Sequence, residues 1–189
     1  MPRPFRLELL FDRDHYECVT RAVLEAKHSV WIATANLKEL MVESPNVVPG
    51  RRRASRRGYR SVLEVFAELA ERGVEIRLLH ASIPSRLFRR SFDAQPALVS
   101  GGLEMRMCPR VHLKTVVIDA GIVYLGSANW TGAGLGAKGE NRRNFEMGIV
   151  TSDEEIIDAV QARYDRIWRG AECSVCRLRE ECEMPLDAI

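Results

Sequence analysis

The stretch that decides the fold runs from His112 to Asn129. It reads His112-Leu-Lys114-Thr-Val-Val-Ile-Asp119, then six residues, then Gly126-Ser127-Ala-Asn129. Residues 112–119 and 122–125 are rich in β-branched and apolar side chains, which is typical of strands. Two positions apart on a strand, His112 and Lys114 would project from the same face.

Neighbouring strands could bring three more polar side chains to that face. Ser127 and Asn129 follow the strand over 122–125, and Glu146 lies in a strand expected over 145–150. A histidine, a lysine, an amide and a hydroxyl in one place form a site for an anionic tetrahedral group. Lys114 supplies the charge, Asn129 supplies an N–H donor, and Glu146 is expected to hold the other ring nitrogen of His112.

Outside this stretch, strand and helix patterns alternate. Strands are expected over 5–11, 29–34, 74–79 and 103–107, with a helix after the first of them. Capping boxes at Ser61 and Ser152 start two amphipathic helices, the second reaching Trp168. Residues 41–60 show neither period. The alternation predicts an α/β domain over residues 1–168, with a polar, cysteine-bearing tail over 169–189 packed on it.

The motif HxKx4D followed by GSxN resembles the signature of the phospholipase D superfamily. Asn144-Phe-Glu146, followed by a helix ending in Trp168, is also similar to that family. The resemblance covers most of the chain. It implies a mixed β-sheet flanked by helices on both faces, and a phosphodiesterase that works through a phosphohistidine intermediate without a catalytic metal.

The same resemblance assigns roles to the motif residues. His112 becomes the nucleophile, and Lys114 and Asn129 become phosphate ligands. Ser127 either binds phosphate or shapes its turn, and Asp119 either takes part directly or supports local structure. The family also needs a second motif histidine, and this chain has one copy of the motif. The resemblance therefore implies a homodimer in which each chain donates its His112 to a composite active site.

An arginine tract points to the substrate. Lys and Arg total 28 against 26 Asp and Glu, a net charge of +2. The tract contains Arg51, Arg52, Arg53, Arg56, Arg57 and Arg60, without which the balance would be negative. Concentrated charge of this kind suits a nucleic-acid backbone, DNA or RNA, and the chain is expected to be a nuclease. The alternatives are a solvated loop, a phospholipase D or phosphatidyltransferase acting on anionic lipid, and a noncatalytic nucleic-acid-binding module.

Three cysteines near the C-terminus suggest a structural metal site. Cys173, Cys176 and Cys182 have the spacing CxxCx5C, which is similar to the iron–sulfur staple of RecB-like nucleases. A fourth thiolate must come from elsewhere, and by that analogy Cys18 is preferred over Cys108. Zinc fits the ligands as well as an iron–sulfur cluster does. A disulfide or redox role is a further alternative.

Composition and the N-terminus bear on location. The longest uncharged stretch, 120–137, is broken by glycines and polar residues, so no transmembrane segment is expected and a membrane partner is disfavoured. Asp12 and Asp14 come before any apolar run of signal-peptide length. A cytoplasmic protein is therefore expected.

Overall fold

The computed structural model describes residues 4–44 and 58–188. The strands are β1 (Glu8–Phe11), β2 (Ser29–Thr34), β3 (Met41–Glu43), β4 (Tyr59–Ser61), β5 (Glu75–His80), β6 (Glu104–Met107), β7 (Thr115–Ile118), β8 (Ile122–Gly126) and β9 (Met147–Thr151). The α-helices are α1 (Arg21–Leu24), α2 (Val62–Glu71), α3 (Arg86–Asp93) and α4 (Glu154–Trp168). Short η turns are η1 (His15–Thr20), η3 (Leu98–Gly102), η4 (Glu140–Arg142), η5 (Arg179–Glu181) and η6 (Leu186–Ala188).

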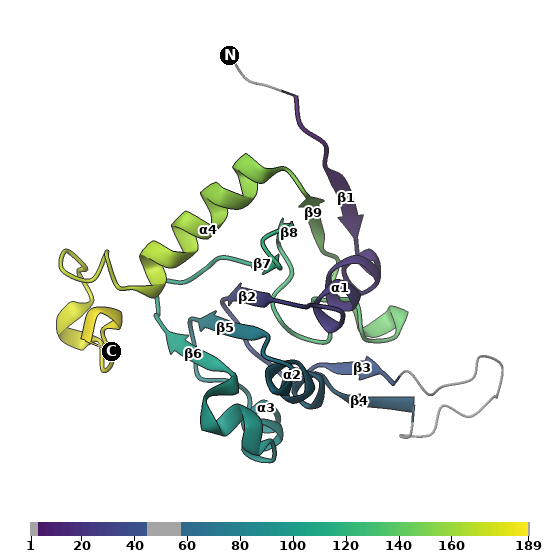
Figure 1. Cartoon of the computed structure of the whole chain (residues 1–189), viewed down its shortest axis with the longest axis horizontal. Helices are drawn as coiled ribbons and strands as arrows, with labels where there is room; N and C mark the ends of the chain where they lie inside the picture. The colour runs from purple at the N-terminus through teal and green to yellow at the C-terminus, as the bar shows by residue number, and fades with distance from the viewer. Residues whose placement is uncertain (1–3, 45–57, 189) are drawn as a thin grey trace.

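Seven of these strands form one mixed sheet in the order β1-β9-β8-β7-β2-β5-β6 (Figure 1). β2, β5 and β6 are parallel, because a helical crossover lies between successive strands. β7, β8, β9 and β1 pair antiparallel, and β7 joins the two halves by pairing antiparallel with β2. The predicted mixed α/β sheet is confirmed.

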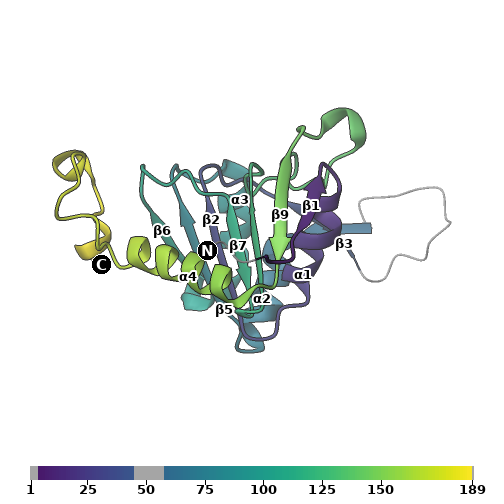
Figure 2. The ribbon, with the colours of Figure 1, turned by 90° about the horizontal axis from the view of Figure 1, so that it is seen from above.

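Helices cover both faces of the sheet (Figure 2). On one face, α1 and α2 bury the main apolar core, in which Phe66 and Trp130 are almost fully enclosed. On the other face, α4 lies across the strands and packs Tyr164 and Trp168 against Trp31 of β2. Within the described ranges, no helix is long and apolar enough to cross a bilayer.

The structure differs from the expected elements in three places. β3 and β4 pair as a hairpin at the two ends of the stretch that shows no period. β7 begins at Thr115, so His112 and Lys114 lie in the segment leading into the strand rather than on it. Ser61 caps α2 through a capping box as expected, but Asp153, one residue beyond Ser152, caps α4.

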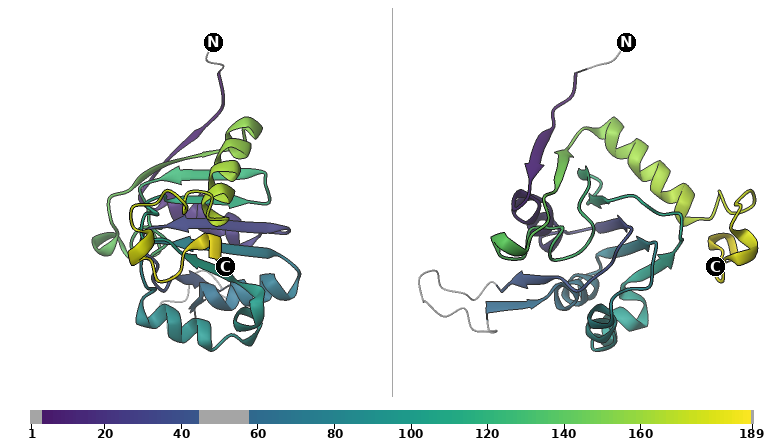
Figure 3. Two further views of the ribbon diagram at one scale, coloured as in Figure 1. Left: turned by 90° about the vertical axis from the view of Figure 1, so that its left-hand side faces the viewer. Right: turned by 180° about the vertical axis from the view of Figure 1, so that it is seen from behind.

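The C-terminal tail, residues 169–188, folds back on the end of α4 beside β6 (Figure 3). Gly170 has a φ of +70°, and a Cβ there would lie 2.2 Å from the backbone nitrogen of Asp187. Leu186 is 3% exposed and packs with Trp168 and Val111. The tail is thus joined to the sheet through the segment that leads to His112.

Candidate active site

The motif residues gather where β8 ends and β7 and β9 begin. The backbone nitrogen of Gly126 donates to the Lys114 carbonyl at 3.1 Å. The backbone nitrogen of Ser127 donates to the Met147 carbonyl at 3.0 Å, next to Glu146. Strand pairing therefore places Lys114, Ser127 and Glu146 at one edge of the sheet.

Gly126 is required at this edge because of Tyr124. A Cβ on Gly126 would lie 2.2 Å from the Tyr124 hydroxyl oxygen, and a Cβ on Gly148 would also meet that ring. The Tyr124 hydroxyl accepts a hydrogen bond from the backbone nitrogen of Ala128 at 3.2 Å. Burial raises the pKa of Tyr124 to about 12. A neutral, buried tyrosine thus shapes the Gly126–Asn129 turn.

His112 and Lys114 touch each other. The Lys114 Nζ lies 3.0 Å from Nδ1 and 3.1 Å from Nε2 of His112, and donates to the His112 carbonyl at 2.9 Å. The His112 side chain is exposed. Burial lowers the pKa of Lys114, and the nearby Glu146 carboxylate opposes that shift. An imidazole ring and an ammonium group therefore lie side by side at this edge.

Glu146 has different partners from the one predicted. Its carboxylate accepts hydrogen bonds from the Ser127 hydroxyl and, at 2.9 Å, from Nδ2 of Asn144. Its backbone nitrogen donates to Asp12 Oδ1 at 3.2 Å. Within the described chain, Glu146 forms no hydrogen bond with the His112 ring. The predicted contact between Glu146 and a ring nitrogen of His112 is thus replaced here by contacts with Ser127 and Asn144.

Asn129 is fixed by the loop that follows β2. Its side-chain oxygen accepts hydrogen bonds from the backbone nitrogens of Ala35 and Asn36, each at 3.1 Å, and from the Thr34 hydroxyl at 3.3 Å. Because the amide group is planar, the Asn129 Nδ2 points away from that loop. This orientation leaves Nδ2 able to donate to a phosphate oxygen.

Asp119 lies away from the other motif residues. It follows β7, whereas Lys114 precedes the strand. Its carboxylate accepts hydrogen bonds from the backbone nitrogens of Lys27, His28 and Ser29 at 2.7–3.1 Å. Burial raises its pKa, but these backbone donors outweigh burial and the pKa is lowered. Of the two predicted roles, its position supports the structural one.

The remaining histidines take no part in the site. His15 is fully buried against the Tyr124 ring, and its Nδ1 lies 3.1 Å from the Asp12 carbonyl. His80 is 5% exposed, with Nδ1 2.9 Å from the Ser82 carbonyl. Burial lowers the pKa of both rings. His28 lies in the segment whose backbone nitrogens are held by Asp119, away from the other motif residues.

A groove of about 720 Å³ adjoins the site and shares Asn129 and Asn144 with it. Lys38 and Lys138 also line this groove, together with Glu39. Burial raises the pKa of Glu39, although the nearby hydroxyls of Ser61 and Ser91 partly oppose the shift. The groove thus offers cationic and hydrogen-bonding groups beside the reactive pair.

Most of the predicted basic tract cannot be placed. Arg51, Arg52, Arg53, Arg56 and Arg57 lie outside the described residues. Arg60, on β4, pairs with Glu68 of α2 through two hydrogen bonds, one of them 3.0 Å. Its charge is therefore already paired within the chain.

The cysteines separate into two groups. Cys18 lies on η1, and its thiol is 4.0 Å from a Glu8 carboxylate oxygen on β1, the outermost strand on one side of the sheet. Cys108 follows β6, the outermost strand on the other side. The tail cysteines line a cavity with Cys108 and not with Cys18, so the structure places Cys18 away from the thiols that it was predicted to join.

Sequence reasoning missed two residues that build the edge. Asn144 binds the Glu146 carboxylate and lines the groove. Its position two residues before Glu146 could have indicated this contact, because residues two apart in an extended segment project from the same face. Thr34 donates to the Asn36 carbonyl at 2.8 Å and accepts from the Trp130 backbone nitrogen at 2.9 Å. Nothing in its local sequence indicated that role.

Similar proteins share this architecture. A 49-residue segment, 26% of the chain, is 41% identical to the "Mitochondrial cardiolipin hydrolase" of Drosophila melanogaster and covers 17% of that protein. NucT from Helicobacter pylori superposes with a TM-score of 0.58 at 18% identity, covering 86% of this chain and 95% of NucT. Nuc from Salmonella typhimurium, a phospholipase D family member, superposes with a TM-score of 0.59 at 14% identity, covering 88% of this chain and 95% of Nuc.

The family model described as "Cardiolipin synthase, PLD-like domain" matches residues 19–168. The match spans the sheet from the helical turn after β1 to the last residue of α4, and it contains every motif residue at the catalytic edge. The tail lies beyond it. The chain therefore belongs to the PLD-like family, whose members are generally phosphodiesterases.

Proposed function

We propose that the chain hydrolyses phosphodiester bonds of nucleic acid, with His112 as the nucleophile. The contact between the Lys114 ammonium and the exposed His112 ring is the observation that carries the proposal. Asn129 lies at the same edge, where its Nδ2 can donate to a phosphate oxygen, and the hydroxyl of Ser127 holds the Glu146 carboxylate beside it. The groove then receives the rest of the substrate.

The reaction has two displacements. A neutral ring nitrogen of His112 attacks phosphorus, so that a P–N bond forms while the P–O bond to the leaving group breaks. The leaving oxygen takes a proton from a second histidine. Water then attacks the phosphohistidine, the second histidine takes the proton of that water, and the P–N bond breaks. Lys114 neutralises part of the phosphate charge and Asn129 donates a hydrogen bond to it, without a metal ion.

The second histidine is His112 of another copy of the chain. An apolar strip beside the edge supports this pairing: Leu7, Leu9, Phe11, Phe145 and Met147 are 44–97% exposed. Phe11 and Met147 are paired across β1 and β9, so they share one face next to Glu146. Two copies that cover this strip would bring their catalytic edges together.

Lipid hydrolysis is the second candidate. The similarity to a cardiolipin hydrolase favours it, and the apolar strip would then contact a lipid surface. Lys38 and Lys138 in the groove support the nucleic-acid proposal, since both can neutralise backbone phosphates. A noncatalytic role is disfavoured, because the contact between His112 and Lys114 lies beside the free Nδ2 of Asn129. A cytoplasmic location remains a prediction.

One assay separates these functions. Labelled single- and double-stranded DNA and RNA, and vesicles containing cardiolipin, are incubated with the protein in excess EDTA. Cleavage of a nucleic acid that persists in EDTA and is lost in His112→Ala is the expected result. Conversion of cardiolipin to phosphatidic acid and phosphatidylglycerol, with no cleavage of nucleic acid, would establish lipid hydrolysis, and no cleavage of any substrate would contradict both.

The composite site has its own test. Wild-type and His112→Ala chains are co-expressed in equal amounts with different affinity tags, and the mixed dimers are isolated. If both histidines are needed, these dimers have less than about a hundredth of wild-type activity. Retention of half the activity would show that each chain acts alone.

A further inference from the structure

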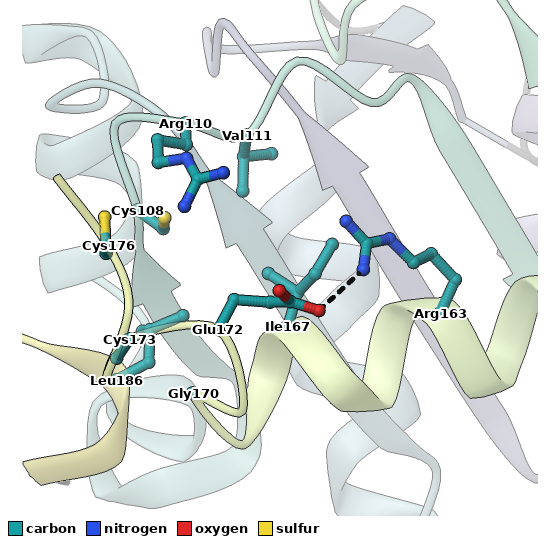
Figure 4. A pocket seen from close by; sticks show the side chains of 10 residues that line it. All are labelled: Cys108, Arg110, Val111, Arg163, Ile167, Gly170, Glu172, Cys173, Cys176 and Leu186. Carbon is teal, nitrogen blue, oxygen red and sulfur yellow. Dashed lines mark hydrogen bonds and ion pairs between the residues drawn. The ribbon is translucent and has the colours of Figure 1, made fainter.

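Four cysteines line one small cavity beside β6, the outermost strand on the side of the sheet away from Cys18. Cys108, just after β6, meets Cys173, Cys176 and Cys182 of the tail there. All four are free thiols. Figure 4 shows an adjoining cavity of about 90 Å³, which shares Cys108, Cys173 and Cys176 with the first. Two segments that are about 65 residues apart in the sequence therefore bring thiols to one place.

Successive turns present the tail thiols. The Cys176 backbone nitrogen donates to the Cys173 carbonyl at 3.1 Å, and the Arg179 nitrogen donates to the Cys176 carbonyl at 3.1 Å. The Cys182 nitrogen donates to the Arg179 carbonyl at 3.3 Å. Arg110 and Arg179 also line the cavity, and the Arg110 guanidinium is within hydrogen-bonding reach of the Cys176 thiol. Two cations thus offset part of the charge that four thiolates would bring.

The tail has little else to hold it. Among residues 171–188, Leu186 is the one buried side chain. The Arg179–Asp187 ion pair, at 2.7 Å, is at the surface and contributes little stability. Segments without an apolar core of their own are usually fixed by disulfides or a metal centre.

The spacing of the thiols bears on which metal centre fits. A single zinc ion binds sulfur at about 2.3 Å, which holds four thiolates within about 4 Å of one another. Across the described ranges, no group of three His, Cys, Asp or Glu residues has the geometry to hold one ion. A [4Fe–4S] cluster binds each of its four cysteines at a different iron, so the thiolates stand further apart around a larger space.

We propose that Cys108, Cys173, Cys176 and Cys182 bind a [4Fe–4S] cluster that clamps the tail to the segment leading to His112. Each thiol loses its proton on binding, and no change of oxidation state is needed. The Val111 nitrogen donates to the Cys108 carbonyl at 2.9 Å, and Val111 packs with Leu186. The cluster would therefore fix the turn immediately before the nucleophile.

The test measures metal directly and needs no substrate. Full-length protein is purified without oxygen, and its iron, acid-labile sulfide and zinc are determined together with its visible absorption. About four irons and four sulfides per chain are expected for wild type and for Cys18→Ser, the matched control. Cys108→Ser and Cys176→Ser should lose most of both.

Other outcomes overturn the proposal. One zinc per chain and no sulfide would replace the cluster with a zinc site, and no bound metal would exclude both. Loss of iron in Cys18→Ser but not in Cys108→Ser would place the fourth ligand on η1.

If the serine variants do not fold, wild-type protein is treated with a ferric oxidant and a chelator. Bleaching of the visible band should then coincide with proteolytic cleavage after residue 168, and bleaching without that cleavage would contradict the clamp.

Discussion

The catalytic edge and the C-terminal tail lie on the same sheet but are held by different forces. At the edge, strand pairs fix the backbone, with Thr115 opposite Leu125 and Gly126 opposite Gly148. The tail has turns and 3₁₀ segments, one buried side chain and surface ion pairs. The edge is therefore ordered without help from its reactive side chains, whereas the tail depends on a few side-chain contacts.

This difference explains where each kind of chemistry lies. A nucleophile must be exposed to meet its substrate, so it cannot also support the fold, and the paired backbone does that instead. A structural metal centre does the reverse, because its ligands hold together segments that have no regular pairing. The family match ends at Trp168, where the sheet and α4 give way to the tail.

Gly170 gives the largest expected effect on stability. In Gly170→Ala, the new Cβ would meet the backbone of Leu186 and Asp187 at 2.2–2.8 Å, at a φ of +70°. We expect a loss of about 2–4 kcal/mol in the free energy of unfolding, because strain and clash add. Urea unfolding and limited proteolysis of the tail measure it.

Gly73→Ala is the matched control for that variant. Gly73 has a φ of +85°, but a Cβ there would have nothing within 4 Å. Gly73→Ala should lower the free energy of unfolding by about 1 kcal/mol, from backbone strain alone, and leave the tail resistant to protease. Equal losses of unfolding free energy in the two variants would show that the contact between residue 170 and the tail contributes no stability.

The clustering of the motif residues follows from local sequence. His112 and Lys114 precede β7, and Ser127 and Asn129 follow β8, so the pairing of these two strands brings them to the open end of one hairpin. Glu146 belongs to the next strand and follows by the same rule. The sheet could be predicted for a similar reason, since β-branched runs alternate with capped helices.

The partners of individual side chains could not be predicted, because they depend on contacts between residues that are far apart in the sequence. Cys18 and Cys108 were equally available by spacing, and only the strand order places them at opposite edges. The partner of Glu146 depended on the side chain of Asn144, and the role of Asp119 on backbone groups about 90 residues earlier. Such choices are made by packing, which one sequence does not reveal.

Asp119 should give an intermediate effect that depends on pH. In Asp119→Asn, the amide nitrogen would face the backbone donors of residues 27–29, at an expected cost of about 1–2 kcal/mol at neutral pH. The folded pKa lies below the unfolded value of about 3.9, so this stability is present above that pH. It is lost as the pH falls through the lower, folded value.

Urea unfolding of both proteins at neutral pH and at several acidic values checks this linkage. The gap between wild type and Asp119→Asn should narrow below about pH 4. Asp93→Asn, on α3, is the control and should show a smaller gap at every pH. A gap that stays constant through the acidic range would mean that the Asp119 charge does not stabilise the turn.

His112→Ala gives the smallest expected change in stability, although under the proposed function it should abolish cleavage. The described contacts of the ring are with Lys114, and the side chain is exposed, so its removal should change the free energy of unfolding by less than about 0.5 kcal/mol. Asn129→Ala is the contrast within the same edge: its side-chain oxygen holds the loop after β2, and its loss should cost about 1–3 kcal/mol. Urea unfolding of both variants at neutral pH decides the matter, because a destabilised His112→Ala would mean that the nucleophile itself supports the edge.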